Sequence, residues 1–578
     1  MVSKITANPA DGKQLCRMKN KQFTPKLFSL LSGGISRTQA MRDIMSGVIV
    51  GIVALPLAIA FAIASGVSPD KGLITAVIAG LIISALGGSR VQIGGPTGAF
   101  IVIVYAIVQE HGVGGLTIAT FMAGFLIIAF GLARLGDLLK FIPYPLIVGF
   151  TSGIALIIFS SQVKDFFGLA IDTLPADFIG KWTVYFQHFT QVNWYAFGIA
   201  LVTVVISLQF HRVTTKIPGS IVAIVLSTIV VLVFQIPVET IETKFGNIPN
   251  RIPLPSIPQV DFETVKALIQ PAFAIALLGA IESLLSAVVA DGMIGGRHRS
   301  NMELVAQGTA NIFSAVFGGI PATGAIARTA TNIKNGGRTP IAGITHALAL
   351  LLIMMLFAPL AKLIPMATLA GILVVVAWHM GEWHLFFSML RSNRADLLIL
   401  LTTFLLTVIF DLVIAIEIGV VLSSFFFMKR MSDSLIIRNS VDILGPQNEN
   451  GEESFEEEAL TVPKGVLLYE IHGPLFFGAS QKFQDTLLNL HQKPKILILR
   501  MRNVPFMDAT GAYHLKQLVR HLQAQQVRIL LSGVGEEVQG ELEKSGFHKL
   551  VDKSNILANI QEAIYKSREI LSLKSQGM

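Results

Sequence analysis

Long apolar segments fill the chain between residues 43 and 430, and most are close to the length of a membrane-spanning helix. A helix needs about 20 apolar residues to cross the hydrocarbon core of a bilayer. By this measure the region divides into fourteen segments, two of them short half-helices. Their approximate limits are 44–66, 72–88, 96–109, 115–133, 138–160, 193–210, 217–235, 267–290, 302–318, 325–334, 340–360, 365–380, 395–411 and 412–429. The pattern predicts an α-helical polytopic membrane protein.

Two of these segments follow similar breaks that are rich in glycine and proline. The first break contains Gly94-Gly95-Pro96-Thr97-Gly98-Ala99, and the second contains Ile320-Pro321-Ala322-Thr323-Gly324-Ala325. Irregular backbone is tolerated at membrane depth only where it lines a cavity or is buried in protein. Matching interruptions in two halves of a chain indicate the binding site of a transporter. We therefore expect each break to be an extended strand that leads into a half-helix beginning inside the membrane.

The segments divide into two halves of seven, residues 43–235 and 267–430, which a proline-rich extracellular connector at 236–266 joins. Because seven is odd, the halves insert with opposite topology and form an inverted repeat. A basic tail at 1–42 precedes them, and the loops after even-numbered segments are about twice as rich in lysine and arginine as the other loops. We expect a multi-pass protein of the plasma membrane, in a bacterium the inner membrane, with both termini cytoplasmic.

Composition agrees with the membrane assignment. The chain is 52% hydrophobic and 14% charged, whereas soluble domains carry roughly 25% charged residues. The net charge of +8 is explained by basic residues beside the membrane segments, so we expect no nucleic acid partner. The single cysteine excludes an internal disulfide, and no histidine or cysteine spacing indicates a metal site. No nucleophile–base pair or cofactor loop is found, so neither an enzyme nor a cofactor is expected.

Arg328 lies in the first turn of the second half-helix. Helix N-termini have unpaired N–H groups and a partial positive charge, so two of them facing each other form an anion site. An arginine near the bilayer midplane is costly and indicates function. Its fixed charge would add to the two helix dipoles. The alternative is a loop arginine, or one that extends its side chain to the membrane surface.

Glu282 follows about ten apolar residues. Such a carboxylate is costly to ionise, so Glu282 is expected to bind a proton near neutral pH. Ser286 lies one turn later on the same helix face, and a carboxylate with a hydroxyl equally suits a sodium site. The structural alternative is that Glu282 is the partner of a helix end or of Arg328.

Beyond residue 430 the sequence changes character. A polar linker with an acidic stretch covers 431–463, and residues 464–570 alternate between strand and helix patterns. Strands are predicted at 465–471, 496–501 and 528–534, and helices at 508–523, 536–546 and 555–567. The sequence therefore predicts a C-terminal α/β domain.

Four motifs resemble the SulP anion-transporter family. They are Leu55–Phe61, Gly94–Gly98, Leu278–Ser283 and Phe317–Thr329. The resemblance extends over residues 40–570 and implies a core and a gate domain, with the anion between the third and tenth segments, and a homodimer. The residues that it places around a small inorganic or carboxylate anion are Leu57, Phe61, Gly95, Thr97, Gly98, Ala327 and Arg328. Many animal members have serine in place of Ala327 and an aromatic residue in place of Thr97, so the ligand shell differs here.

The resemblance also bears on the coupling ion. Bicarbonate-transporting relatives that use sodium have aspartate and threonine where this chain has Glu282 and Ser286, and glutamate resembles the proton-coupled branch that includes DauA, a dicarboxylate-uptake protein. We therefore predict a proton-coupled symporter of sulfate or C4-dicarboxylate, with bicarbonate also compatible. A sodium-coupled bicarbonate symporter, an uncoupled anion channel or uniporter, and a membrane scaffold remain alternatives.

The C-terminal domain resembles the STAS domain of this family and of bacterial anti-sigma-factor antagonists. The motif is Met507-Asp508-Ala509-Thr510-Gly511. In the antagonists, the residue that matches Thr510 is a phosphorylated serine, and phosphate is favourable at a helix N-terminus. The simpler alternative is that Asp508 and Thr510 cap the helix. Membrane lipid and a soluble partner of this domain are the remaining expected contacts.

Overall fold

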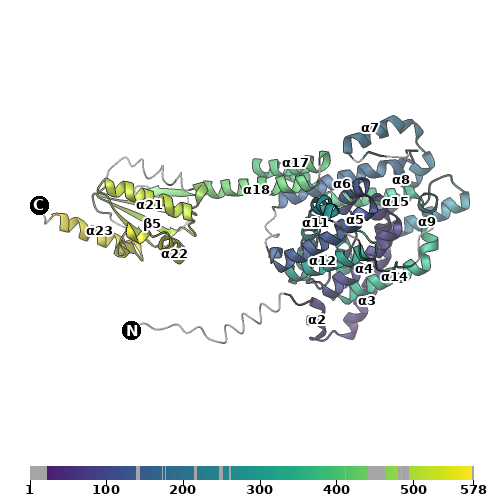
Figure 1. Cartoon of the computed structure of the whole chain (residues 1–578), viewed down its shortest axis with the longest axis horizontal. Coiled ribbons are helices and arrows are strands. Elements are labelled where there is room, and N and C mark those ends of the chain that lie inside the picture. Colours follow the sequence, from purple (N-terminus) through teal and green to yellow (C-terminus); the bar gives the residue numbers. More distant parts are fainter. Residues whose placement is uncertain are drawn as a thin grey trace. The chain divides into compact units, whose positions relative to one another are not determined.

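The computed structural model describes most of the chain. The described residues are 23–137, 143–171, 174–175, 177–213, 218–246, 251–258, 262–410, 412–439, 462–479, 483 and 494–575. They form two units, Met1–Val420 and Val421–Met578, which Figure 1 shows in one colour scale along the chain. The first part of the predicted basic tail and the acidic stretch after residue 451 lie outside the described residues.

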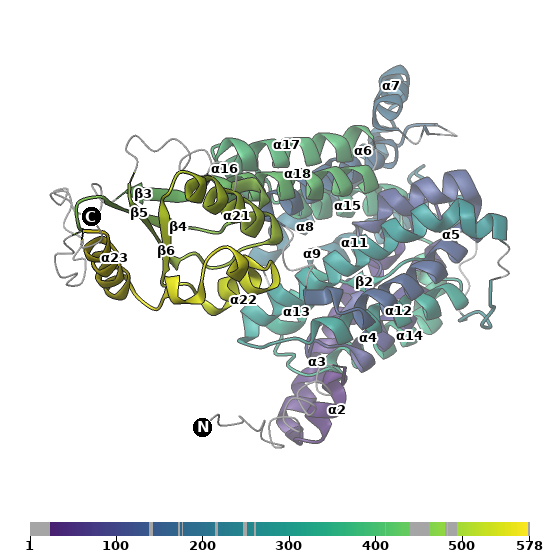
Figure 2. The same ribbon diagram turned by 60° about the vertical axis from the view of Figure 1, so that its left-hand side comes forward.

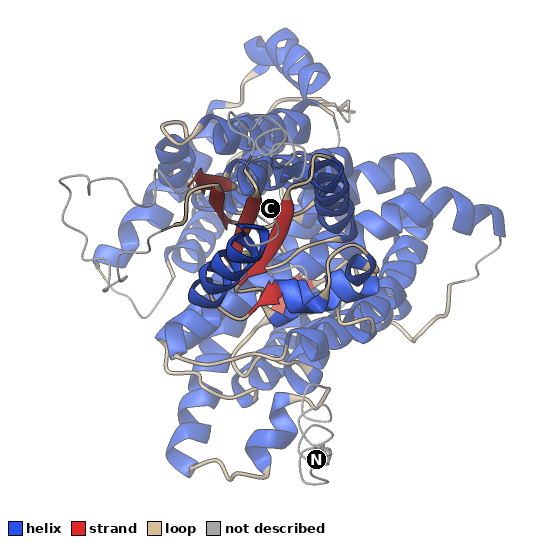
Figure 3. Cartoon of the chain, turned by 90° about the vertical axis from the view of Figure 1, so that its left-hand side faces the viewer, coloured by secondary structure: helices blue, strands red, loops and turns tan. Residues whose placement is uncertain are grey.

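The first unit is almost entirely helical, as the colouring of Figure 3 shows. Its helices are α2 Lys26–Leu31, α3 Arg37–Ala64, α4 Pro69–Leu86, α5 Phe100–Leu132, α6 Tyr144–Phe167, α7 Phe178–His188, α8 Trp194–Gln209, α9 Gly219–Phe234, α10 Ile241–Phe245, α11 Phe262–Ile294, α12 Ser300–Val316, α13 Ile326–Lys334, α14 Ile341–Ala361, α15 Met366–Met380, α16 Trp383–Met389, α17 Arg394–Ile409 and α18 Leu412–Asp433, the last of which continues into the second unit. Each predicted segment overlaps one of them. The predicted segments 96–109 and 115–133 share α5, which is interrupted at Gly112 (φ 69°).

Six of the described helices are long and apolar enough to cross a membrane. They are α3, α4, α5, α6, α11 and the stretch Met366–Met389, and α7 with α8 would add a seventh span although the pair is bent by 116°. The fold is that of a polytopic membrane protein, and the count of fourteen spans stays a prediction. The short helices α7, α10 and α16 were not expected from the sequence.

Helix contacts in the first unit fall into two groups. One group joins α3, α4, α5, α11, α12 and α14, and the other joins α6, α8, α9, α15 and α17. Within the first group, α5 from the first half of the chain packs on α11 and α12 from the second half. In the same way, α14 from the second half packs on α3 and α4 from the first half. An inverted repeat produces such reciprocal contacts between its two halves. The α5–α12 contact is close because a β-carbon at Gly124 or Gly308 would clash with the backbone of the other helix.

The two glycine- and proline-rich breaks meet as a pair of short strands. Strand β1 (Gly94–Gly95) pairs antiparallel with β2 (Thr323–Gly324), and Gly94 lies opposite Gly324. The label of β2 lies between those of α11 and α13 in Figure 2. Asn311 holds the second break by bonding to both backbone polar groups of Ala322, at 2.9 and 2.8 Å. The pairing brings the N-termini of α5 and α13 together from distant parts of the chain.

The second unit is a five-stranded sheet with helices on both faces (Figure 2). Its strands are β3 Ile436–Asn439, β4 Val466–His472, β5 Ile496–Asn503, β6 Arg528–Ser532 and β7 Ile556–Leu557, and its helices are α21 Ala509–Ala524, α22 Glu536–Lys544 and α23 Ile560–Ser575. The strands lie in chain order; β3 is antiparallel to β4, and the other pairs are parallel. Strand β3 falls within the range that the sequence assigned to the linker.

Alternation along the strands explains the two cores of this unit. In β5, Leu497 and Leu499 point to the core that includes α21 and α22, whereas Ile496 and Ile498 point to the core that includes α23. Successive side chains of a strand face opposite sides of the sheet. Because both faces are covered, both sets of side chains are apolar.

Candidate functional site

The N-termini of α5 and α13 lie directly after the paired strands. In α5 the first turn begins at Thr97, because the amides of Phe100 and Ile101 donate to Thr97 (3.3 Å) and Gly98 (3.1 Å). In α13, Ala325 precedes the helix and accepts a hydrogen bond from the amide of Thr329 at 2.9 Å. The first amides of each helix have no partner within that helix. The arrangement presents two positive helix ends near one another.

Arg328 extends from α13 to the break before α5. Its Nη2 donates to the carbonyl of Pro96 at 2.7 Å, and its side chain is buried, with 2% of the residue exposed. Nη1 has no hydrogen-bond partner among the described residues. A buried unpaired donor costs about 1–3 kcal/mol, and more in a charged group. One arm of the guanidinium therefore fixes the side chain, and the other is free to bind a ligand.

Gly95 makes room for this guanidinium. A β-carbon at residue 95 would clash with Nη1 of Arg328. The backbone φ of Gly95 is 149°, a value that residues other than glycine rarely adopt. The glycine of the first break and the arginine of the tenth segment, both predicted for the site, therefore meet directly.

Glu282 contacts the same region from α11. The hydroxyl of Thr97 donates to Oε2 of Glu282 at 2.9 Å, so two residues predicted for different roles are hydrogen-bonded to each other. No carboxylate lies within ion-pair distance (4.0 Å) of Arg328 among the residues described. Glu282 is therefore hydrogen-bonded to the start of α5 and forms no ion pair with Arg328 within this distance.

Ser286 lies apart from this contact. Its hydroxyl is buried and lies 3.5 Å from the hydroxyl of Thr329 in α13, a long contact for a hydrogen bond between hydroxyls. No hydrogen bond joins it to Glu282 among the described residues. The hydroxyl of Thr329 also accepts a hydrogen bond from the amide of Ile93 at 3.0 Å. Ser286 thus contributes to the joint between α11, α13 and the first break.

The other predicted residues are Gly98 at the start of α5 and three apolar residues, Leu57, Phe61 and Ala327. A β-carbon at Gly98 would lie 3.6 Å from the ring of Phe61, so this ring covers the start of α5. Phe61 is 5% exposed, and Leu57 packs partly buried against the same core. Ala327 is exposed beside the buried Arg328. The structure brings α3, α5 and α13 to one place, with polar groups on the strand side and apolar groups on the α3 side.

Two residues near the site were missed from the sequence. Gln92 donates from its side chain to the carbonyl of Ser283 at 3.1 Å, and it occupies the space where Gly324 has no side chain. His346 of α14 is fully buried beside Gly80, and neither ring nitrogen has a partner among the described residues. Gln92 lies between Val91 and Ile93, and His346 precedes a long apolar run; a polar side chain beside apolar residues was the available signal.

In the second unit, Asp508 caps α21. Its carboxylate accepts from the amide of Gly511 at 2.7 Å and from the amide of Phe477 at 3.1 Å. Thr510 is the second residue of that helix and is half-buried; its phosphorylation stays a prediction. In the part of the chain that the structure describes, no group of three or more histidine, cysteine, aspartate or glutamate residues is arranged to hold a metal ion.

Comparison with known families and proteins follows the division into two units. Residues 41–403 match the Sulfate permease family, and residues 459–563 match the STAS domain. The chain is 43% identical to YvdB of Bacillus subtilis, a protein named for sulfate transport, over 89% of this chain and 96% of the relative. It is 31% identical to the bicarbonate transporter BicA of a Picosynechococcus strain, over 90% of this chain and 94% of BicA.

Solved structures agree with the fold. The overall structure of SLC26A9 matches with a TM-score of 0.83 at 17% identity, covering 100% of this chain and 98% of that chain. The transmembrane domain of a cyanobacterial BicA matches with a TM-score of 0.60 at 31% identity, covering 67% of this chain and 98% of that chain. DauA is not singled out by these comparisons, and the resemblance to it stays a prediction. The chain belongs to the sulfate permease family and is a multi-pass membrane transporter of small anions with a C-terminal STAS domain.

Proposed function

We propose that this protein is a secondary active symporter that moves a small inorganic oxyanion together with a proton. Sulfate is the first candidate substrate, because the relative at 43% identity is named for sulfate transport, and bicarbonate is the second, because BicA is 31% identical. C4-dicarboxylates are the third, on the sequence resemblance alone. The protein lies in the plasma membrane as a homodimer with both termini in the cytoplasm.

The free Nη1 of Arg328 is the observation that carries the anion site. The guanidinium is held by Pro96, its second arm has no partner in the described structure, and it lies beside the two helix N-termini. Charge-assisted hydrogen bonds from arginine to an oxyanion are stronger than neutral ones. An oxyanion at this place would satisfy the unpaired donor and accept amide hydrogen bonds from α5 and α13.

Glu282 supplies the coupling. An ionised carboxylate near the site repels an anion at Arg328, and adding a proton removes that charge, so anion and proton bind together. Thr97 can bond to Glu282 in both protonation states. Its hydroxyl donates to the ionised carboxylate at 2.9 Å and can accept from the protonated acid. Transport then requires the group of helices around α3 and α5 to move against the group around α6 and α15, exposing the site to each side in turn.

Uptake by the full-length protein in proteoliposomes tests the proposal. Labelled sulfate, bicarbonate, succinate and fumarate are offered with an inward proton gradient, with a sodium gradient, or with neither. Accumulation of one anion only under the proton gradient supports symport and identifies the substrate. Accumulation that needs sodium would replace the proton assignment, and equal downhill flux in all three conditions would indicate a channel or uniporter.

The variant Glu282→Gln isolates the coupling step. The amide stays neutral, so we expect anion uptake to continue downhill and the stimulation by a proton gradient to disappear. Glu263→Gln is the matched control, because Glu263 is exposed in the first turn of the same helix. Uptake by the Glu282 variant that is still driven by the proton gradient contradicts the assignment.

A further inference from the structure

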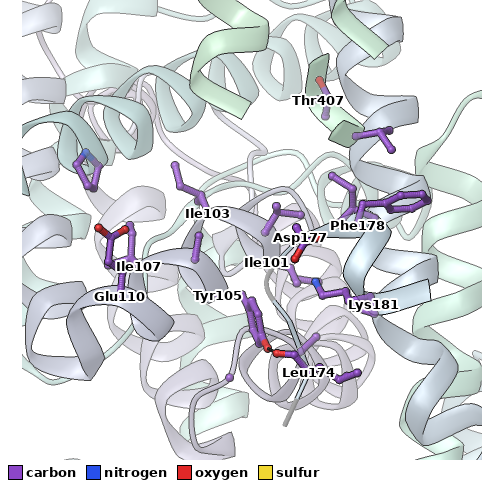
Figure 4. A pocket seen from close by; sticks show the side chains of 18 of the residues that line it. Ile101, Ile103, Tyr105, Ile107, Glu110, Leu174, Asp177, Phe178, Lys181 and Thr407 are labelled. Carbon is purple, nitrogen blue, oxygen red and sulfur yellow. Dashed lines mark hydrogen bonds between the residues drawn. The ribbon is translucent and has the colours of Figure 1, made fainter. Parts of the chain in front are cut away.

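A cavity lies beside the candidate site. Its volume is about 710 Å³, and side chains from the end of α3, from α5, α6, α7, α11 and α17 line it. Ile101 and Ile157 form part of its wall. Ile101 is one turn beyond Thr97 in α5, and Ile157 precedes Ile158, whose side chain would lie 3.3 Å from a β-carbon at Gly98. The cavity therefore adjoins the elements that hold the site. Figure 4 shows its lining, with Tyr105, Asp177 and Lys181 facing the interior.

Lys181 is the unusual group in this cavity. Only 6% of the residue is exposed, and its ammonium lies 4.9 Å from the centre of the Tyr105 ring. The Tyr105 hydroxyl is turned to the carbonyl of Leu174 at 3.4 Å, so the ring face is fixed toward the lysine. No hydrogen bond or ion pair to Lys181 Nζ is formed among the described residues. A lysine buried without a carboxylate partner is rare.

The carboxylates that line the cavity have other partners. Asp165 pairs with Lys244 at 3.1 Å. Asp177 caps α7 and accepts from the amide of Gly180 at 2.6 Å. Glu110 is mostly exposed and lies 3.8 Å from Nε2 of His111. Lys164 also lacks a carboxylate within 4.0 Å in the described part of the chain, since its ammonium donates to the carbonyl of Ile171. In the described part of the chain, neither Lys164 nor Lys181 therefore has a carboxylate within 4.0 Å, although Asp177 lies near Lys181 in the cavity wall (Figure 4).

We propose that this cavity holds a second anion site, centred on Lys181, which a small oxyanion occupies on its way to or from Arg328. This inference rests on the proposed anion transport and adds a second binding site for the same anion on its path. An ammonium that is held over an aromatic ring and shielded from water attracts an anion more strongly than an exposed one.

The site also has to release its anion. Lys181 has one compact charge, whereas an arginine offers two donors to one anion. The negative charge of the nearby Asp177 also weakens the binding of an anion. Conduction through successive sites needs binding that is favourable enough for entry and weak enough for exit. Lys181 therefore affects the entry of substrate from one face of the membrane, the face toward which α3 ends.

Sided transport measurements test this role. In proteoliposomes of known orientation we expect Lys181→Gln to raise the KM for sulfate roughly tenfold when sulfate is supplied to the face where α3 ends, with kcat unchanged. The KM from the opposite face stays at the wild-type value. High salt reduces the difference between the variant and the wild type. Lys181→Arg, which keeps the charge, does not raise the KM. Lys266→Gln, which removes an exposed lysine of α11 outside the cavity lining, stays close to wild type.

A binding measurement does not depend on the stability of the lysine variant. Trp182 is the neighbour of Lys181 and donates to Ser160 at 3.0 Å, and phenylalanine in place of Trp194, Trp378 and Trp383 leaves it as the only indole. We expect sulfate to change its emission saturably, and the half-saturating concentration to persist after Arg328→Gln. Loss of the response with Arg328→Gln, or no response, contradicts the second site.

Different experimental results would contradict the proposed function and the proposed second site. If the wild type transports none of the four anions, the proposed function fails. If the wild type transports sulfate while Lys181→Gln keeps the wild-type KM on both faces, only the second site fails.

Discussion

Arg328 uses the two terminal nitrogens of its guanidinium in different ways. Nη2 is bonded to the carbonyl of Pro96, and Nη1 is left unpaired in a buried place. A lysine has one compact charge and cannot keep a backbone contact and offer a second donor in a fixed direction. At the scale of the residue, the proposed anion site therefore depends on the shape of the arginine as well as on its charge.

A binding experiment separates charge from shape. We expect Arg328→Gln to weaken sulfate binding about tenfold to a hundredfold, since a hydrogen bond to a charged group contributes about 1.5–3 kcal/mol. Arg328→Lys should recover only part of this loss. Calorimetric titration of the purified protein measures both. Lys334→Gln, in the last turn of the same helix, is the control, and equal affinity in the wild type and the glutamine variant would remove Arg328 from the site.

The sequence predicted the charged residues of the candidate site but not all their neighbours. Arg328 and Glu282 were recognisable because charges inside apolar segments are costly. Ser286 was expected beside Glu282, since helix spacing gives a shared face; its hydroxyl lies instead near Thr329. Spacing along one helix does not say which other helix covers that face. Gln92 and His346 were missed for the same reason, because their surroundings come from segments far away in the chain.

Among the elements, the two-residue strands β1 and β2 determine the position of both helix N-termini. The sequence predicted extended breaks before two half-helices but not their pairing, since two residues are too few to show a strand period. Pairing depends on Asn311 and on the absence of side chains at Gly94, Gly95 and Gly324. The helices were easier to predict because each carries a long apolar run.

Gly95→Ala tests this element. The added methyl group would clash with Nη1 of Arg328 and would place alanine at a φ of 149°. We expect the variant to insert into the membrane and to lose most of its sulfate uptake, because the arginine moves away from the break. Gly198→Ala in α8 is the matched control, since nothing lies within 4 Å of the added atom. Normal uptake by the Gly95 variant would contradict the role given to the strand.

The cap of α21 allows a test in the second unit. Asp508 bonds the amides of Gly511 and Phe477, so Asp508→Ala should lower the free energy of unfolding by about 1 kcal/mol. Asp508→Asn keeps an accepting oxygen and should lower it less. Urea unfolding of a fragment covering residues 432–578 measures the difference, because this unit has its own core. An alanine variant as stable as the parent would show that the cap contributes nothing.

For the molecule as a whole, the similarity in fold extends much further than the similarity in sequence. SLC26A9 shares 17% of its residues with this chain and gives a TM-score of 0.83. Apolar runs and two breaks were enough to predict the transporter class, because a bilayer allows few solutions for the backbone. The strand β3 could not be predicted, since it is short and lies before a long polar stretch.

The pairing of β1 with β2 also has a consequence for biosynthesis. About 230 residues separate the two strands, so the first must remain in the membrane without its partner until the second has been made. At a synthesis rate of about 5–20 residues per second, this interval lasts roughly ten to fifty seconds. During that time the backbone of Gly94 and Gly95 has no strand partner, and the first seven segments depend on lipid, water or the insertion machinery. The binding site is therefore completed late, after most of the first unit has been synthesised.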